Sequence, residues 1–307
     1  MSRSWVVDLI GAEAFAQLSR GLSGSQLHSL LLEVLHARAK MRSPAELLAQ
    51  YQRDRFCSSA AVDQRTSLSI DAELFAAADG FEALELSPVA PLGACSTVAL
   101  TDQNRVLSAL RSTEVAADPT NVLALECALR LRTDRNQPVH LATSQRVVRA
   151  QAVPPVPGLT QHFRIFALAS GGLETRDHGF TVDALVRQAQ VVLHALERLE
   201  RRGYALDKQR IEVLATPERA GLGDRIAERL GSTSSRKRLE HPYYSGGLRY
   251  SILATAPDGA ELPLADGGAF NWLAKLTSNR RAAYVATGVG AQLIPSRFRS
   301  PTPGAAG

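Results

Sequence analysis

Apolar residues in the first part of the chain recur every three or four positions, which is the spacing of one face of a helix. One such face consists of Leu27, Leu30, Leu31, Val34 and Leu35. Ser43 and Pro44 supply an N-cap and a first-turn proline for a second helix, which carries Leu47, Leu48 and Tyr51. Residues 1–60 are therefore predicted to form a helical N-terminal extension, a hairpin packed on the core.

From residue 65 to residue 295 the pattern changes to alternating helices and strands. Helices are predicted at 71–78, 119–131, 182–202 and from Pro217, and strands at 81–86, 105–110, 139–151, 162–170 and 210–215. Strands joined mostly by hairpins, with helices gathered on one side, indicate an α+β fold with an antiparallel sheet flanked by helices. No glycine-rich turn follows the first strand, which argues against a dinucleotide-binding fold. The Pro/Gly/Ala-rich residues 296–307 are predicted to be a disordered tail.

Composition is that of an ordinary globular protein, with 307 residues, 45% hydrophobic and 21% charged. The sequence shows neither a signal peptide nor an apolar run long enough to span a bilayer, so we expect no membrane association and a cytoplasmic location. Three widely spaced cysteines suggest neither a disulfide framework nor a zinc site. The seven histidines show no ligand-like spacing, so no metal site is predicted.

The formal charge of +5 invites a nucleic-acid interpretation, but its distribution argues against one. Only four of the 35 basic residues are lysines, and the arginines are spread along the whole chain. The one basic run, Arg236-Lys237-Arg238, falls in a Ser/Gly-rich segment that is more typical of a solvated loop than of an RNA contact. Nucleic acid is therefore not expected as a partner.

The segment 241–293 reads as a double-Tyr turn, an apolar strand, a hairpin, a Gly-Gly turn into a helix and a glycine-punctuated last strand. This layout resembles the end of a class II aminoacyl-tRNA synthetase core, and in particular histidyl-tRNA synthetase and the regulatory subunit of ATP phosphoribosyltransferase. The resemblance covers about residues 65–295. It implies a homodimer formed through the helix and strand that end at Pro88.

The resemblance also suggests where ATP phosphates would bind. QRVVRAQ (145–151), a loop, and HFRIF (162–166) look like the family's strand-loop-strand element. Arg149 takes the place of the phosphate-binding arginine, Gln151 stands where a glutamate is usual, and Arg164 could support a phosphate or an acidic ligand. Alternatively, Arg149 and Arg164 are cross-strand surface residues.

An amino-acid pocket is implied by two further segments and by four glycines. Arg111, Thr113 and Glu114 match a family turn that lines this pocket, with Glu114 suited to an α-ammonium group; alternatively, Glu114 pairs with Arg111 or caps the next helix. Tyr243 and Tyr244 begin a Tyr-Tyr-Ser-Gly run that resembles the family's Tyr-Tyr-Thr-Gly. The glycine-rich floor of the pocket is assigned to Gly267, Gly268, Gly288 and Gly290.

Several positions depart from the synthetase pattern. Leu239 stands where a catalytic arginine is expected, Pro242 replaces an aspartate, and Gln292 or an aliphatic neighbour fills the position of the last-strand arginine. Losing these cations should cost several kcal/mol of transition-state stabilisation. The chain also ends soon after the last core strand, without the expected anticodon-binding domain.

These departures favour a non-charging paralogue that binds an amino acid or a nucleotide-like ligand. It would act as a regulatory subunit on a catalytic partner protein. An AMP-forming ligase that uses ATP with magnesium and an altered set of cations is the alternative, and an RNA-binding adaptor is a third possibility.

Overall fold

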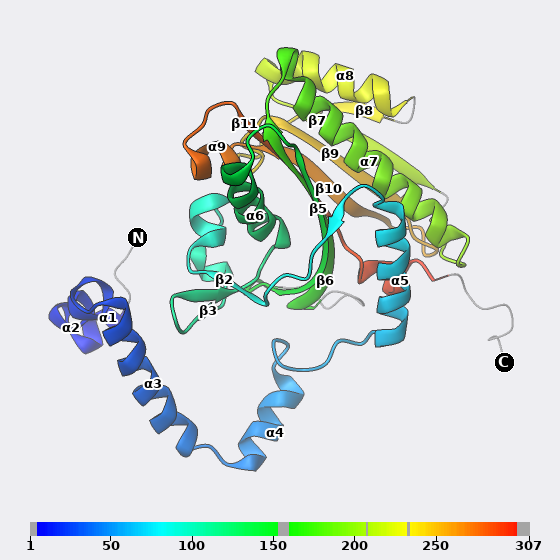
Figure 1. Ribbon diagram of the computed structural model, residues 1–307. Helices are drawn as coiled ribbons and strands as arrows, with labels where there is room; N and C mark the ends of the chain where they lie inside the picture. The colour runs from blue at the N-terminus through cyan, green and yellow to red at the C-terminus, as the bar shows by residue number, and fades with distance from the viewer. Residues whose placement is uncertain (1–4, 153–159, 207, 232–233, 300–307) are drawn as a thin grey trace, which may run out of the picture.

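The computed structural model describes residues 5–152, 160–206, 208–231 and 234–299. Its centre is a mixed sheet of eight strands in the described part, ordered β1-β5-β6-β11-β10-β9-β7-β8 (Figure 1). The strands span Glu82–Ala83 (β1), Val139–Val148 (β5), His162–Leu173 (β6), Gln209–Ala215 (β7), Ser234–Arg238 (β8), Leu248–Thr255 (β9), Glu261–Phe270 (β10) and Ala282–Val289 (β11).

The six central strands, from β5 to β7 in this order, pair antiparallel. The two edge strands, β1 and β8, lie parallel to their neighbours β5 and β7. The α+β class and the antiparallel sheet are thus confirmed. The predicted loop around Arg236-Lys237-Arg238 is wrong, because these residues belong to β8, where Val213 of β7 pairs with Arg236.

Helices cover both faces of the sheet, so the prediction that they gather on one side is wrong (Figure 1). On one face, α5 (Gln64–Ala77), α7 (Gly179–Glu200) and α8 (Ala220–Leu230) bury a core that includes Leu185, Leu196 and Ile252. On the other face, α6 (Pro119–Thr133) and α9 (Trp272–Thr277) pack around Leu123 and Trp272. Pattern along the chain predicts each helix but does not show the face on which it packs.

Helix α6 begins as its sequence predicts, with Asp118 as N-cap and Pro119 in the first turn. Beside it lies a small sheet of β2 (Val89–Pro91), β4 (Thr113–Val115) and β3 (Ser108–Ala109). The connection between β2 and β3 contains the short π-helix η2 (Ala94–Val98) and the 3-10 turn η3 (Gln103–Arg105). This small sheet and its connection form a separate layer on the α6 face.

The Gly-Gly turn predicted at Gly267 and Gly268 is wrong. Both glycines lie within β10, where they pair with Tyr250 and Arg249 of β9. A Cβ on Gly267 would meet the Tyr250 ring at 2.4 Å, and one on Gly268 would meet the Tyr244 ring at 2.3 Å. These positions are therefore glycine because tyrosine rings cover the strand from both faces, and not because the backbone turns.

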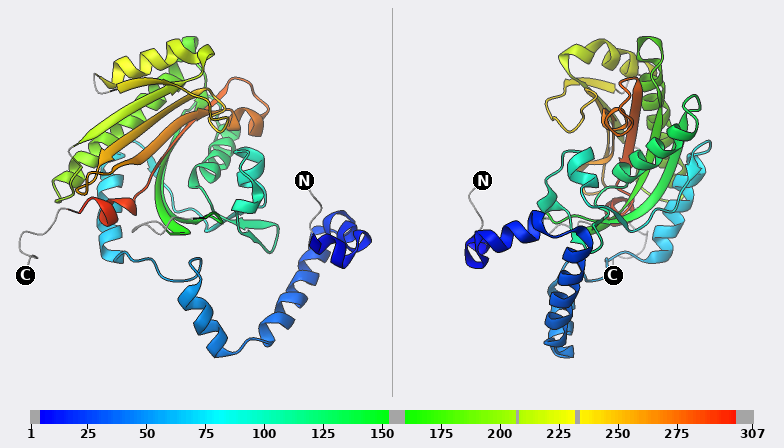
Figure 2. Two further views of the ribbon diagram at one scale, coloured as in Figure 1. Left: turned by 180° about the vertical axis from the view of Figure 1, so that it is seen from behind. Right: turned by 60° about the vertical axis from the view of Figure 1, so that its left-hand side comes forward.

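The first helices are α1 (Trp5–Ile10), α2 (Ala12–Ala16), α3 (Gly24–Lys40) and α4 (Pro44–Arg53), with the π-helix η1 (Gln17–Gly21) after α2. Figure 2 shows that they project from the body of the molecule as an arm with a bend between α3 and α4. None of these helices contains a buried residue. The predicted packing of this segment on the core is thus wrong.

The C-terminal helix α10 (Leu293–Arg297) is followed by Phe298, which is fully buried, and the carbonyl of Phe298 accepts a 2.7 Å hydrogen bond from Ala205 N. The predicted disordered tail therefore starts too early, and residues 300–307 lie outside the described residues. Within the described ranges, no helix combines the length and apolar character needed to cross a membrane.

Candidate ligand-binding site

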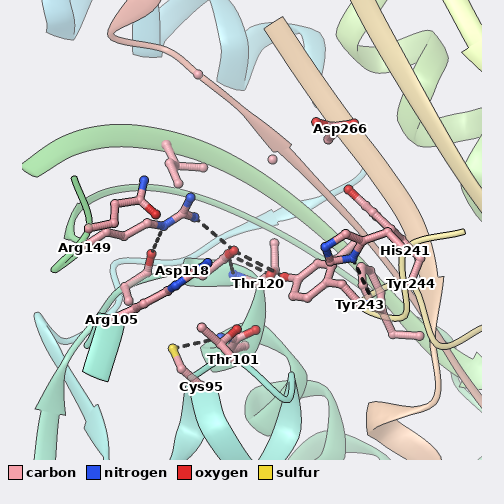
Figure 3. A pocket seen from close by; sticks show the side chains of 18 of the residues that line it. Cys95, Thr101, Arg105, Asp118, Thr120, Arg149, His241, Tyr243, Tyr244 and Asp266 are labelled. Carbon is pink, nitrogen blue, oxygen red and sulfur yellow. Dashed lines mark hydrogen bonds and ion pairs between the residues drawn. The ribbon is translucent and has the colours of Figure 1, made fainter. Parts of the chain in front are cut away.

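A cavity of about 680 Å³ opens on the α6 face of the sheet (Figure 3). Its walls come from the start of α6, strands β6, β10 and β11, the 241–244 turn and the 100–105 loop. Elements distant in sequence therefore meet at one place. The cavity includes Arg149, Gln151, Tyr243 and Tyr244 from the sequence prediction, and whether they bind a ligand stays a prediction.

Arg149 is fixed by three contacts at one side of this cavity. Its Nε donates to Ala117 O at 2.8 Å, and its Nη2 lies 3.2 Å from Asp118 Oδ2. Its guanidinium also stands over the Phe163 ring, 5.1 Å from the ring centroid. Arg149 is thus an oriented, partly exposed cation rather than a free surface side chain.

Asp118 was predicted only as a helix cap, yet its carboxylate also faces the cavity. Oδ1 accepts from Thr120 N at 3.0 Å and from Thr120 Oγ1 at 2.7 Å, which completes the cap. Oδ2 remains on the cavity side, next to Arg149. The run Asp118-Pro119-Thr120 showed where a helix begins, but the spacing of the sequence could not show that this helix begins at a pocket.

Tyr243 and Tyr244 belong to an aromatic cluster with Phe270 and Trp272, and the last two rings stack with centroids 4.0 Å apart. The Tyr243 hydroxyl lies 3.5 Å from Asp118 Oδ2. Burial raises the pKa of both tyrosines, with Asp118 adding to the effect at Tyr243. Both phenols therefore stay neutral and offer the cavity an apolar wall with hydroxyl groups.

Asp266 on β10 is a second cavity carboxylate that sequence reasoning missed. Arg249 of β9 donates to its Oδ1 from Nε at 2.8 Å and from Nη2 at 2.6 Å. The same guanidinium stands 5.1 Å from the centroid of the Tyr244 ring. Burial raises the pKa of Asp266, whereas Arg249 acts in the opposite direction. The pair makes this wall polar without adding net charge.

Arg105 and Asp102 complete the charged lining on the loop side. His241 lies across the cavity from Arg105 (Figure 3). Among the described residues that line it, the cavity thus has two guanidinium groups, Arg105 and Arg149, and three carboxylates, Asp102, Asp118 and Asp266. With these charges, the cavity wall lacks the strong positive potential that binding of a polyphosphate requires.

Cys95 also lines the cavity, and Asn121 Nδ2 donates to its sulfur at 3.0 Å. Burial raises the pKa of the thiol to about 12, so it is protonated at neutral pH and is a poor nucleophile. In the described ranges, no three His, Cys, Asp or Glu side chains gather closely enough to hold a metal ion. The cavity therefore has the character of a binding site without an evident nucleophile.

Arg164, predicted to support a phosphate, lies on the opposite face of the sheet. Its Nη1 is 2.9 Å from Asp71 Oδ2 of α5 and 3.4 Å from Ser144 Oγ. Strand alternation explains this placement, because its neighbour Ile165 faces the cavity. The assignment of Arg164 to the phosphate group is corrected accordingly.

Arg111, Thr113 and Glu114 do not line the cavity either. Arg111 lies in an exposed turn with φ of 62°, and Thr113 Oγ1 donates to Leu110 O at 2.7 Å. The buried Glu114 accepts hydrogen bonds from Gly93 N, Cys95 N and Gln103 Nε2, at 2.8, 2.9 and 2.9 Å.

Glu114 instead holds the β2–β3 connection in place. Burial alone would raise the pKa of Glu114, but the hydrogen bonds from Gln103 and from the amides of Cys95 and Gly93 lower it overall. Its role is thus structural. Asp118, four residues later, lines the cavity, and Glu114 does not.

Of the four glycines predicted as a pocket floor, Gly288 and Gly290 line the cavity. Gly267 faces the other side of the sheet, and Gly268 lies beneath the Tyr244 ring. Among the positions that depart from the synthetase pattern, Leu239 is buried, and Gln292 contacts Arg146 and Thr160 at 3.2 and 3.3 Å. Neither is among the residues that line the cavity.

Comparison with solved structures identifies the fold. A protein from Bacillus halodurans, described as an ATP phosphoribosyltransferase regulatory subunit/histidyl-tRNA synthetase, superposes with a TM-score of 0.58. The match has 14% identity and covers 77% of this chain and 80% of that one. The chain has the fold of a class II synthetase core.

Two further structures agree. A histidine-tRNA ligase subunit from Alicyclobacillus acidocaldarius has a TM-score of 0.58 and 12% identity, over 78% of this chain and 94% of that one. Apo histidyl-tRNA synthetase from S. aureus has a TM-score of 0.54 and 14% identity, over 75% of this chain and 64% of that one. At such identities the likeness establishes the fold alone.

No protein-family model matches the sequence. No curated protein matches it either. We therefore infer the function from the cavity and its chemistry.

Proposed function

We propose that this class II synthetase-like protein binds a free amino acid in the cavity and does not charge tRNA. Arg149 and Asp118 carry the proposal, because an arginine and a carboxylate 3.2 Å apart can bind the two charged groups of a zwitterion. The ligand carboxylate would take the guanidinium of Arg149, and its ammonium group would take Asp118 Oδ2. Tyr243 and Tyr244 would contact the rest of the ligand.

ATP fits this wall poorly. A triphosphate needs several cations, but three carboxylates and only two guanidinium groups line the cavity among the described residues. We therefore assign no step to ATP or magnesium.

A protein that binds a ligand without catalysing a reaction exerts its effect through another protein. We propose that this protein regulates a catalytic partner. Support comes from the Bacillus halodurans neighbour, whose description names a regulatory subunit. A synthetase-like cavity that senses an amino acid would then control the activity of the partner by binding or releasing that amino acid.

A thermal-shift and calorimetric screen of the twenty amino acids and of ATP tests the binding step. One or a few amino acids should raise the Tm of the wild type, and ATP should not. Arg149→Ala should abolish the shift, whereas Arg176→Ala, on an exposed turn with its side chain 96% exposed, should preserve it. Equal binding by wild type and Arg149→Ala would refute the site.

An AMP-forming ligase is the second candidate, and Arg105 is the observation that favours it. Arg105 lines the cavity next to Arg149, since Ala150 N donates to Arg105 O at 2.8 Å, and no described carboxylate pairs with its guanidinium. Amino-acid-dependent pyrophosphate exchange separates the two candidates. We expect none, and robust exchange that is lost in Arg149→Ala would establish the ligase instead.

A further inference from the structure

A second cavity, of about 390 Å³, lies where α6 and α9 end (Figure 1). Three arginines line it, namely Arg132, Arg135 and Arg280. The other residues of the lining are uncharged, and they are Leu131, Leu173, Thr277, Ser278, Asn279 and Ala282. This cavity, called the arginine hollow below, therefore combines three positive charges with an apolar part and with hydrogen-bonding side chains.

The charges of the arginine hollow are not neutralised by the surrounding chain. In the part of the chain that the structure describes, the side chains of Arg132, Arg135 and Arg280 make neither a hydrogen bond nor an ion pair. All three are exposed. The guanidinium groups are thus available to a ligand.

Carboxylates close to the end of α6 are engaged elsewhere. Glu82 and Glu126 both bind Arg130, at 2.8 and 3.1 Å. Asp134 Oδ1 accepts a 2.9 Å hydrogen bond from Asn136 N, and Asp134 does not line the hollow. The acidic residues of this region therefore leave the hollow positive.

Helix stabilisation accounts for only part of this cluster. Arg132 lies in the last turn of α6, where a cation interacts favourably with the helix dipole. Arg135 and Arg280 lie beyond the last residues of α6 and α9, Thr133 and Thr277. The fold brings them to Arg132 from two segments that are far apart in sequence, so the even spread of arginines along the chain does not reveal the cluster.

We propose that the arginine hollow docks an acidic segment of another protein. Guanidinium groups bind carboxylates through paired hydrogen bonds, and three of them suit a segment with several Asp or Glu side chains. Leu131, Leu173 and Ala282 would contact an apolar side chain of the same segment. An apolar centre with a polar rim is the usual anatomy of a protein interface, in which arginine is enriched.

The lining favours a protein over a nucleic acid. Sites for single-stranded nucleic acid add aromatic side chains on which bases stack, and no aromatic residue lines the hollow among the described residues. The carbonyl ends of α6 and α9 also add partial negative charge beside the hollow. Separate carboxylates on a peptide need less positive potential than a run of phosphates.

The arginine hollow shares two elements with the amino-acid cavity. Helix α6 contributes Thr120 to the cavity and Leu131 to the hollow, and β11 contributes Gly288 to the cavity and Ala282 to the hollow. A bound protein and a bound amino acid would thus contact opposite ends of the same helix and strand. That the docked protein is the regulated catalytic partner rests on the proposed function, whereas the docking itself does not.

Fluorescence anisotropy with a rhodamine-labelled peptide, four glutamates around a central leucine, tests the docking. At about 50 mM salt, where exposed charges are weakly screened, wild type should bind this peptide at least about tenfold more tightly than its glutamine counterpart. Replacing the central leucine by glycine should weaken binding about fivefold. No amino acid is added, so failure of the proposed amino-acid binding would not change these results.

Arginine variants locate the interaction. Arg132→Gln and Arg280→Gln should each weaken binding of the glutamate peptide at least about fivefold. Arg281→Gln is the matched control, because Arg281 is also exposed but does not line the hollow, and its Nη2 lies 3.5 Å from Glu174 O. It should stay within about twofold of wild type. All three side chains are exposed, so each variant should keep its Tm.

Photo-crosslinking adds a second readout. A glutamate peptide with benzoylphenylalanine in place of its leucine should label residues 131–135 or 277–282, as mapped by mass spectrometry. Labelling elsewhere, equal binding of the glutamate and glutamine peptides, or equal losses in Arg280→Gln and Arg281→Gln would overturn the proposal. Tighter binding of a single-stranded oligonucleotide than of the peptide, lost in Arg132→Gln, would also overturn it.

Discussion

Asp118 uses its two carboxylate oxygens for different purposes. Oδ1 caps α6 through Thr120, and Oδ2 faces the cavity beside Arg149. Asparagine caps helices about as well as aspartate, so Asp118→Asn removes the charge and keeps the cap. We predict that this variant loses at least about tenfold in affinity for an amino-acid ligand, with a change in Tm of no more than a few degrees.

Calorimetric titration of the variant with the amino acid found in the screen measures this loss. Asp102→Asn is the matched control, because Asp102 lines the same cavity and caps the short turn at Gln103–Arg105, but has no described contact with Arg149. It should retain most of the affinity. If Asp118→Asn binds as tightly as wild type, the ammonium group is held elsewhere.

At the scale of single residues, the sequence predicted the cavity only in part. Arg149, Tyr243 and Tyr244 carried recognisable motifs, and all three line the cavity. Glu114 matched a motif as well, but its carboxylate is consumed by backbone amides of its own layer. The direction in which a carboxylate points depends on how the layers of the fold pack together. It cannot be predicted from the local sequence.

Strand β10 shows the same limit at the scale of an element. Adjacent glycines favour a turn when only local propensity is considered. Here Gly267 and Gly268 continue the strand, because Tyr250 and Tyr244 occupy the two faces where side chains would otherwise stand. The glycines therefore position Tyr244 at the cavity wall.

We predict that Gly268→Ala lowers both the stability of the fold and the affinity for the ligand. A Cβ at this position would lie 2.3 Å from the Tyr244 ring and 2.8 Å from Leu248 O, so Tyr244 must move. Its contact with Arg249 would be disturbed as well. We expect a loss of at least about tenfold in affinity, measured by the same titration.

Gly288→Ala is the control on the neighbouring strand. Its Cβ would meet Ile165 Cγ2 at 3.6 Å, an ordinary contact, although Gly288 also lines the cavity. The variant should keep its Tm and lose little affinity. Equal losses in the two variants would mean that space in the cavity, and not the position of Tyr244, controls binding.

For the whole molecule, the sequence predicted the fold class and its resemblance to class II synthetases, and the superposed structures agree. It also predicted helices near the N-terminus, but placed them on the core. A helical period of apolar residues predicts that one face of the helix is buried against another surface. It does not show whether that surface belongs to the same chain. In the N-terminal helices no side chain is buried, so the described core does not cover their apolar faces.

A chain that lacks residues 1–53 tests whether the core depends on the arm. The helices of this segment bury no residue, and Ser58, which accepts the hydrogen bond from His162, is retained. We therefore expect the truncated protein to bind the same amino acid and to melt within roughly 3 °C of wild type, which corresponds to about 1 kcal/mol. Calorimetric melting and the amino-acid titration give both quantities, and a fall in Tm of more than about 10 °C would show that the arm is part of the folding unit.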